Sequence, residues 1–197
     1  MLKYLKYKSS SMIMKLVTKR TILEILDSKD AQLMLDYYVE NEEHLESWEP
    51  IREDSFFTLQ NFSKMLDQNQ QDFKTGSALR FTIFDENRNF VIGVCNFTNI
   101  VYGPFQACNL GYSIAEKYQG VGLMKEALEA AIDYVFNELN LHRIMANYLP
   151  SNSRSEKLLA KLGFEKEGLA KSYLKIAGRW KDHILTSKIN PKHNDYQ

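Results

Sequence analysis

The sequence predicts an α+β domain whose central sheet is mixed, mostly antiparallel and flanked by helices. Segments rich in β-branched and aromatic residues follow one another over residues 78–115 with short turns between them, which is the pattern of an antiparallel meander. Residues 110–135 then contain a strand, a glycine turn and a helix with one apolar face. We see no internal repeats and no linker, and 197 residues are enough for one domain with a substantial core.

The composition argues against several classes of protein. Lys and Arg together number 25, as do Asp and Glu, so a broad nucleic-acid-binding surface is not expected. No run approaches the roughly 18 apolar residues of a membrane span, and the start of the chain does not read as a secretory signal. Cys95 and Cys108 lie in apolar, strand-like runs without metal-ligand spacing, so we expect reduced, buried thiols in a cytoplasmic protein that needs no metal.

The first third of the chain contains one expected strand and two expected helices. A strand spans residues 21–26, and Asp27 or Ser28 caps a helix that runs to about residue 40. Residues 41–53 form a loop around Pro50. A second helix spans residues 55–73, with an apolar stripe of Phe56, Leu59, Phe62, Met65 and Leu66. We expect residues 1–17 to be a basic, loosely ordered leader, residues 18–190 the folded domain and residues 191–197 a flexible tail.

The remaining elements follow in order. Strands over residues 78–84, 90–101 and 107–115 form the meander, and a helix runs from Met124 to about residue 135. A strand over residues 141–149 ends at Pro150, and Asn152 can cap a helix that Gly163 terminates. A strand begins at residues 164–167, and residues 172–177 and 180–188 close the sheet as a hairpin.

The turn before the main helix has the chemistry of an anion site. It reads Gln119-Gly120-Val121-Gly122-Leu123-Met124, and its glycines let the backbone approach a ligand without interference from a Cβ atom. The helix that follows begins with unpaired N–H groups and a partial positive charge, which suit a phosphate or pyrophosphate. The turn lacks the Gly-Lys-Ser/Thr ending of a Walker loop and the third glycine of a Rossmann turn. Spacing alone also leaves open a connection that binds nothing.

Two motifs carry a resemblance to a known family. Gln119-x-x-Gly122-x-Met124 resembles motif A of the GNAT acyltransferases, Gln/Arg-x-x-Gly-x-Gly/Ala, although Met124 departs from the usual small residue. Asn152-x-x-Ser155, followed by LLAKLGFEKEG, resembles motif B. The resemblance implies the GNAT fold, with the strands before and after the main helix splayed apart to admit acetyl-CoA. The residues implied to bind acetyl-CoA are Ser113, Ile114, Gln119, Gly120, Val121, Gly122, Leu123, Met124, Lys125, Asn152 and Ser155.

A narrower resemblance implies which amine accepts the acetyl group. It is dense over residues 96–186 and thinner over residues 18–50. These residues resemble the branch of the family that acetylates the N-terminal alanine of small-subunit ribosomal protein number five, so a ribosomal protein N-terminus or the small subunit is the expected partner. Glu24 departs from an arginine common in that branch. A polyamine or other small amine is an alternative, because Glu42, Glu43, Glu46 and Glu49 could form an acidic pocket.

A third interpretation is a ribosome-assembly factor in which acetylation is incidental. Its local rRNA contact would come from the basic residues near the start of the chain, Lys3, Lys6, Lys8, Lys15, Lys19 and Arg20. A solvated tail explains the same residues. The sequence does not indicate an oligomeric state.

The implied reaction makes modest demands on catalytic residues. A peptide α-amine has a pKa of about 8, so roughly a tenth of it is neutral at pH 7 and no dedicated base is obvious or needed. The resemblance makes Ser155 the first candidate for donating a proton to the leaving thiolate, with Tyr148 and Tyr173 as alternatives. A backbone N–H of the strand before the glycine turn would polarise the thioester carbonyl.

The acceptor site is expected at the loop that carries Trp48 and Glu49. An aromatic face and a carboxylate on a loop suit a cationic amine, although a packed tryptophan beside a solvated glutamate explains them equally well. Glu49 is the candidate for holding or deprotonating the amine. Asn96 is the candidate for lining the acceptor channel.

Overall fold

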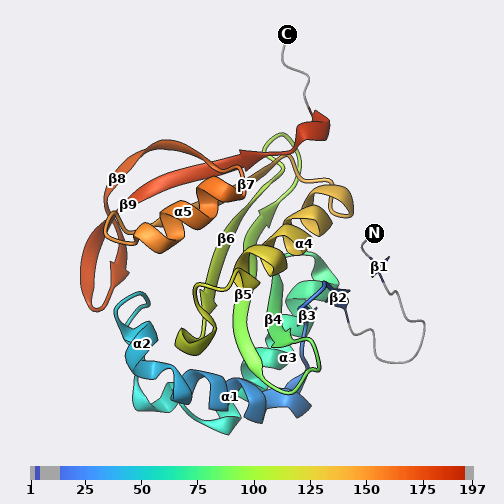
Figure 1. Cartoon of the computed structure of the whole chain (residues 1–197), viewed down its shortest axis with the longest axis vertical. Helices are drawn as coiled ribbons and strands as arrows, with labels where there is room; N and C mark the ends of the chain where they lie inside the picture. Colours follow the sequence, from blue (N-terminus) through green and yellow to red (C-terminus); the bar gives the residue numbers. More distant parts are fainter. Residues whose placement is uncertain (1–2, 5–13, 194–197) are drawn as a thin grey trace.

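The strand segments form one nine-stranded sheet within the residues that the computed structural model describes, 3–4 and 14–193 (Figure 1). The order is β1-β2-β3-β4-β5-β6-β7-β9-β8, and every neighbouring pair is antiparallel except β6 with β7, which is parallel. The predicted mixed, mostly antiparallel sheet is therefore confirmed. The strands are β1 (Lys3–Tyr4), β2 (Lys15–Val17), β3 (Thr21–Glu24), β4 (Leu79–Asp85), β5 (Val91–Val101), β6 (Ala107–Ile114), β7 (Arg143–Tyr148), β8 (Glu165–Ile176) and β9 (Arg179–Ile189).

Helices cover both faces of this sheet and give it two apolar cores. α4 (Leu123–Asn137) and α5 (Ser153–Lys161) contribute to one core, in which Leu128 and Leu159 are buried. α1 (Ala31–Glu40), α2 (Glu42–Glu46) and α3 (Leu59–Thr75) contribute to the other core, with Val94 of β5. Short 3₁₀ turns complete the described chain as η1 (Ser28–Asp30), η2 (Asp54–Phe56), η3 (Glu116–Tyr118) and η4 (Pro191–His193).

Two expectations about the helices were wrong. α2 forms inside the segment expected to be a loop, because Leu45 packs into the core beneath α1 and α3. α3 begins at Leu59 and not at residue 55, because the Thr58 side chain caps it by accepting a hydrogen bond from the Asn61 N–H at 3.3 Å. Leu59 consequently lies in the first turn and is 49% exposed, so it does not belong to the apolar stripe.

Part of the expected leader belongs to the sheet, which corrects the proposed start of the domain. β2 pairs with β3, and Leu16 is only 1% exposed. Lys15 forms an ion pair with Glu24, and Arg20 forms one with Glu126, so two cations assigned to a possible rRNA contact are engaged inside the domain. Of the other cations in that prediction, Lys3 lies in β1, Lys19 is exposed, and Lys6 and Lys8 lie outside the described residues. Residues 1–2 and 5–13 of the leader and 194–197 of the tail are not described.

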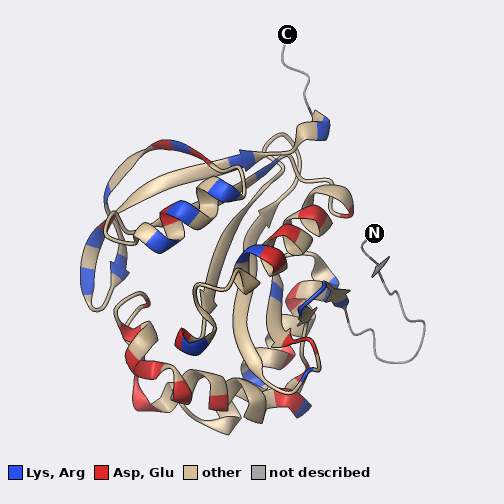
Figure 2. Cartoon of the chain, in the orientation of Figure 1, with Lys and Arg blue, Asp and Glu red and all other residues tan. Residues whose placement is uncertain are grey.

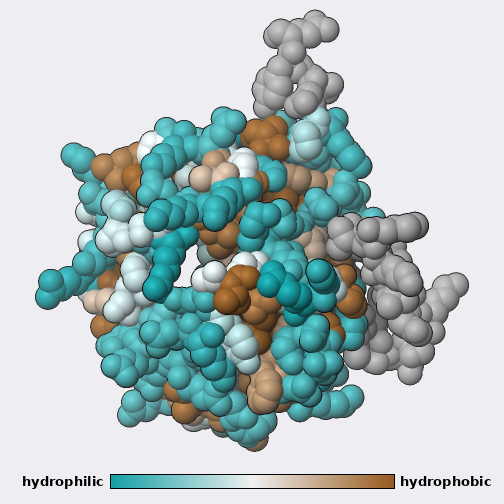
Figure 3. Space-filling view, viewed as in Figure 1, coloured by the Kyte–Doolittle hydropathy of each residue, from teal (hydrophilic) through white to brown (hydrophobic). Residues whose placement is uncertain are grey.

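β6 and β7 separate part of the way along their length. Their pairing runs from Ala107 with Arg143 to Leu110 with Ala146, whereas β6 continues to Ile114 and β7 to Tyr148. Beyond Leu110, β6 stays paired with β5, and β7 stays paired with β9. The sheet therefore opens between its two halves, as the resemblance implied. Figure 3 shows the surface hollowed between α5 and α2.

The β8–β9 hairpin reaches across this opening to the segment after α2 (Figure 1). Ala177 N–H, at the tip of the hairpin, donates to the Glu49 carbonyl oxygen at 3.0 Å. Gly178 has a φ angle of 74°, which favours glycine, and a Cβ atom there would lie 2.8 Å from Ile51 Cδ1, so a larger residue would strain the backbone and shift the end of the Ile51 side chain. The hairpin and the segment after α2 are thus fixed against each other.

The ion pairs of Glu24 in β3 lead to a prediction about stability. Its side chain is buried, accepts a hydrogen bond from Arg88 Nε at 2.7 Å and lies 3.0 Å from Lys15 Nζ. We expect Glu24→Gln to lower the free energy of unfolding by about 2 kcal/mol, because two cations would then face a neutral amide in a poorly hydrated site. Urea denaturation measures this. Glu86→Gln, at an exposed turn position, should change stability by less than about 0.5 kcal/mol; equal losses would contradict a special role for Glu24.

Candidate active site

The glycine turn presents open backbone at the start of α4. Gly120 and Gly122 have φ angles of 79° and 85°, which side chains other than glycine rarely adopt. A Cβ atom on Gly120 would meet no heavy atom within 4 Å. Gly122 is the N-cap residue and no side chain caps the helix, so the first N–H groups of α4 are available to an anion. The geometry fits the pyrophosphate group of acetyl-CoA.

Side chains from outside the turn hold it in place. Arg20 Nη1 donates to the Val121 carbonyl oxygen at 3.0 Å, and Arg20 Nε donates to Glu126 Oε2 at 2.7 Å. Thr18 Oγ1 donates to Glu126 Oε1 at 2.7 Å. Partial burial acts to raise the pKa of Glu126, but the hydrogen bonds from Thr18 and Arg20 outweigh it and hold that pKa below its usual value. The connection between β2 and β3 therefore holds the glycine turn in position.

Met124, the departure from motif A, points into the core. Its side chain is 6% exposed and approaches Gly93 of β5. A Cβ atom on Gly93 would lie 2.5 Å from the Ser113 carbonyl oxygen and 3.3 Å from Met124 Cε. Glycine at position 93 therefore makes room for both β6 and the methionine, and the Met124 side chain leaves the backbone of the turn unobstructed.

Gln119 connects three elements beside the opening. Its Nε2 lies 2.8 Å from His44 Nε2 of α2, and its Oε1 accepts a hydrogen bond from Arg154 of α5. Sequence reasoning selected Gln119 but missed both partners, because His44 and Arg154 are far from it in sequence. Lys125 was also selected for acetyl-CoA binding, and it forms an ion pair with Glu129 one turn along α4.

Ser155 meets Tyr112 across the opening. Asn152 Oδ1 accepts the Ser155 N–H at 3.0 Å, which caps α5 as predicted and places Ser155 in its first turn. Ser155 Oγ lies 2.6 Å from the Tyr112 hydroxyl oxygen of β6. Burial raises the pKa of Tyr112 to about 12, and the hydrogen bond with Ser155 acts in the opposite direction. The motif B serine thus contacts the strand that leads into motif A.

The end of β6 presents unpaired backbone toward the opening. Ala115 N–H donates to the Ile92 carbonyl oxygen at 2.9 Å, toward β5. Because successive N–H groups of a strand alternate in direction, those of Tyr112 and Ile114 point toward β7, where the β6–β7 pairing has ended. Ser113 Oγ lies 3.0 Å from the hydroxyl oxygen of buried Tyr37 in α1. This contact ties β6 to the helix layer on the other face.

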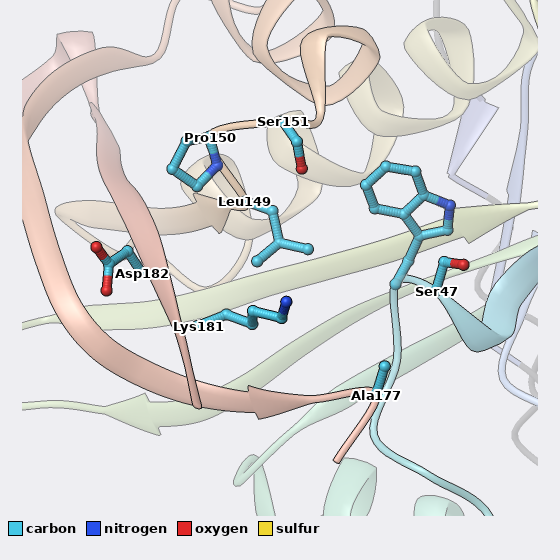
Figure 4. A pocket seen from close by; sticks show the side chains of 8 residues that line it. Ser47, Leu149, Pro150, Ser151, Ala177, Lys181 and Asp182 are labelled. Carbon is cyan, nitrogen blue, oxygen red and sulfur yellow. The ribbon is translucent and has the colours of Figure 1, made fainter. Parts of the chain in front are cut away.

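Trp48 and Glu49 lie where the segment after α2 meets the hairpin. Trp48 is 39% exposed and lines a pocket of about 650 Å³ (Figure 4). Glu49 Oε2 accepts a hydrogen bond from Arg52 Nη2 at 2.7 Å, and that guanidinium lies 4.0 Å from the centre of the Phe56 ring. The structure therefore places the two predicted acceptor residues beside a pocket and pairs the carboxylate with a cation. The pocket is lined by Ser47, Trp48, Leu149, Pro150, Ser151, Ala177, Lys181 and Asp182.

The remaining predicted residues separate into two groups. Asn96 of β5 pairs with Gly111, two positions from Ser113 on the same face of β6, and a Cβ atom on Gly111 would meet nothing within 4 Å. Tyr173 lies on the exposed hairpin, where Asn147 Nδ2 donates to its hydroxyl at 3.3 Å. The Tyr148 hydroxyl donates to Glu156 at 3.4 Å. Of the three candidate proton donors, Ser155 is therefore the one that hydrogen-bonds to β6.

No group of three or more His, Cys, Asp or Glu side chains within residues 3–4 and 14–193 is arranged to hold a metal ion. No helix of this part of the chain is long and apolar enough to cross a membrane.

Comparisons with known proteins identify the family. The acetyltransferase (GNAT) domain model matches residues 20–165. The chain is 48% identical to the [ribosomal protein uS5]-alanine N-acetyltransferase of Escherichia coli strain K12 over 185 residues, which cover 94% of this chain and 95% of that protein.

Two solved structures are also similar. The ribosomal-protein-S5-alanine acetyltransferase from Vibrio fischeri has a TM-score of 0.87 at 42% identity, covering 93% of this chain and 99% of that one. Mycobacterium smegmatis RimJ in complex with CoA-disulfide has a TM-score of 0.83 at 25% identity, covering 93% and 89%. The predicted fold is confirmed, and this chain belongs to the GNAT acetyltransferase family.

Proposed function

We propose that this protein transfers the acetyl group of acetyl-CoA to the N-terminal α-amine of an alanine-starting ribosomal protein, its counterpart of uS5, in the cytoplasm. The observation that carries the proposal is the 48% identity, along almost the whole chain, to an enzyme of that description. The similar chain from Vibrio fischeri has the same described activity. The domain spans residues 14–190 in this proposal, because β2 belongs to the sheet.

The donor site lies between α4, β6 and α5. The N–H groups of residues 120–124 hold the pyrophosphate, and Asn152 keeps the start of α5 beside the opening between β6 and β7. Acetyl-CoA supplies an activated thioester, whose carbonyl oxygen accepts a hydrogen bond from the N–H of Tyr112 or Ile114. These donors are fixed in the sheet before reaction, so they need no reorganisation when negative charge develops on that oxygen.

The acceptor amine attacks from the side of Trp48, Glu49 and Asn96. Glu49 holds the ammonium form near the site, and the amine loses its proton to water or to Glu49. The carbon–nitrogen bond forms as the carbon–sulfur bond breaks. Ser155 Oγ then gives its proton to the leaving thiolate and regains one from Tyr112, which a pKa of about 12 keeps protonated at neutral pH. The resulting phenolate takes a proton from water, to which the acceptor amine has lost one.

Two synthetic peptides test the proposed function. One copies the N-terminus of the organism's own uS5 with a free alanine, and the other has a blocked α-amine but carries a lysine. We expect transfer from labelled acetyl-CoA to the first peptide alone, because its amine has a pKa of about 8 and the lysine about 10.4. Acetylation of spermidine with neither peptide modified would refute the proposal in favour of a polyamine acceptor.

A further inference from the structure

The pocket beside Trp48 is larger than an N-terminal alanine requires. Its volume of about 650 Å³ falls in the range that holds a drug-sized ligand. Trp48 and two residues of the loop after β7, Leu149 and Pro150, supply apolar surface, and Ala177, Lys181 and Asp182 of the hairpin line the rest (Figure 4). A pocket of this size and shape accommodates several consecutive residues of an acceptor chain.

Lys181 and Asp182 are the charged residues that line this pocket, and their side chains point in different directions. Figure 4 shows the Lys181 side chain directed into the pocket, whereas Asp182 is directed away from Lys181. The Asp182 carboxylate accepts the Ser172 N–H at 2.8 Å, which holds it in that position. Lys181 forms no ion pair with another residue of the described chain. The ammonium group is therefore available to an anionic group of a ligand.

The chain segments on the two sides of the pocket differ in charge, although the lining residues of the first segment, Ser47 and Trp48, are uncharged. Residues 40–49 contain five glutamates and no lysine or arginine, whereas residues 169–183 contain four lysines or arginines and one aspartate. Figure 2 shows red along α1 and α2 and blue toward the tip of the hairpin, whereas red and blue are mixed where β8 begins. A peptide with a free N-terminus has its positive charge at one end only. Its ammonium group fits the Glu49 side, and the residues that follow extend toward Lys181.

We propose that this pocket binds the residues that follow the acceptor's N-terminal alanine, and that Lys181 selects chains with an acidic side chain among them. The inference rests on the proposed function and specifies its acceptor class. Lys181 also disfavours polyamine acceptors, because a polyamine is positively charged along its whole length and would place a positive charge beside this lysine.

Peptides that differ only in charge test this selection. We would compare alanine-starting pentapeptides with Glu, Gln or Lys at the third and fourth positions. For the unmodified protein we expect kcat/KM to be roughly tenfold higher for the Glu peptide than for the Lys peptide. Lys181→Gln should remove most of this ratio, and Lys181→Glu should reverse it. A ratio that stays the same in Lys181→Glu would overturn the proposal.

Lys175→Gln is the matched control. Lys175 is another exposed lysine of the hairpin, but it pairs with Trp180 one position from the pair of Leu174 with Lys181, so it lies on the opposite face. It should keep the unmodified preference. If both variants changed the ratio of kcat/KM equally, the preference would come from the overall positive charge of the hairpin and not from Lys181. That result would also overturn the proposal.

A binding measurement separates this inference from the proposed function. The chain has two tryptophans, so Trp180→Phe leaves Trp48 as the only indole and makes its fluorescence a probe of the pocket. We expect tighter binding of the Glu peptide than of the Lys peptide, with the difference lost when Lys181→Gln is added. If no peptide is acetylated, the proposed function fails. The titration still shows whether the pocket binds the Glu peptide more tightly than the Lys peptide. Equal affinities for the two peptides would refute it.

Discussion

We expect Gly122→Val to lower the affinity for acetyl-CoA by about a hundredfold. Gly122 is the N-cap of α4 at φ 85°, where a β-branched residue is a conformational outlier, and a Cβ atom there would lie 3.5 Å from Arg20 Nη2. The distance to Arg20 is an ordinary contact, so the strain lies in the backbone; to relieve it the turn must rotate, which moves the N–H groups of α4 away from the pyrophosphate. Isothermal titration with CoA measures the loss directly, without a peptide acceptor.

A control variant separates the effect of backbone strain from the loss of CoA binding. Gly103, in the turn between β5 and β6, also has a positive φ, 74°, and its Cβ position has no neighbour within 4 Å. Gly103→Val should lose stability for the same backbone reason and keep its affinity for CoA. If both variants bind CoA like the unmodified protein, the turn before α4 is not the pyrophosphate site.

We expect Ser155→Ala to lower kcat by about a hundredfold and to leave the affinity for CoA nearly unchanged. General acid catalysis contributes a factor of this order or more, and the alanine removes the hydroxyl that lies 2.6 Å from Tyr112. The backbone N–H that Asn152 accepts remains, so α5 keeps its cap. Steady-state kinetics with the free-alanine peptide, together with CoA titration, measures both quantities. Unchanged turnover would remove Ser155 from the mechanism.

The pH dependence of kcat/KM tests the Ser155–Tyr112 pair without a substitution. Burial raises the pKa of Tyr112 to about 12, so the phenol keeps its proton as the pH rises to about 10. The acceptor amine, by contrast, becomes neutral as the pH passes about 8. We therefore expect kcat/KM to rise through about pH 8 and to stay level to about pH 10. A fall within that upper range would show that the proton donor has a lower pKa than Tyr112 and is a different group.

The sequence was most informative where short-range patterns coincide with function. The glycine turn, the start of α4 and the Asn152 cap all depend on neighbouring residues, so their positions followed from local rules. β2 was missed because its three residues are too few to show a period, although Leu16 is in the core. Leu59 was misassigned because its helical spacing is correct and only the Thr58 cap shows that it lies in the first, exposed turn.

The candidate site was only half visible in the sequence, because its other half comes from tertiary contacts. Tyr112 in a strand of apolar residues reads as a core aromatic, and nothing local shows that Ser155, 43 positions later, lies against it. The pocket joins segments around residues 48, 150 and 180, which no spacing rule connects. The Gln119 contact with His44 spans 75 positions for the same reason. Such residues become candidates only when the fold brings them together.

The burial of both cysteines has a practical consequence for measuring turnover. Cys95 and Cys108 are free thiols at 0% exposure, and burial raises the pKa of Cys108 to about 12 and that of Cys95 further. Their reactive thiolate fraction at pH 7 is therefore on the order of one in 10⁵ for Cys108, and neither is within reach of a reagent in solution. Each catalytic cycle, in contrast, releases one CoA with an accessible thiol. A colorimetric disulfide reagent can therefore count product continuously in the native enzyme, with negligible background from the protein itself.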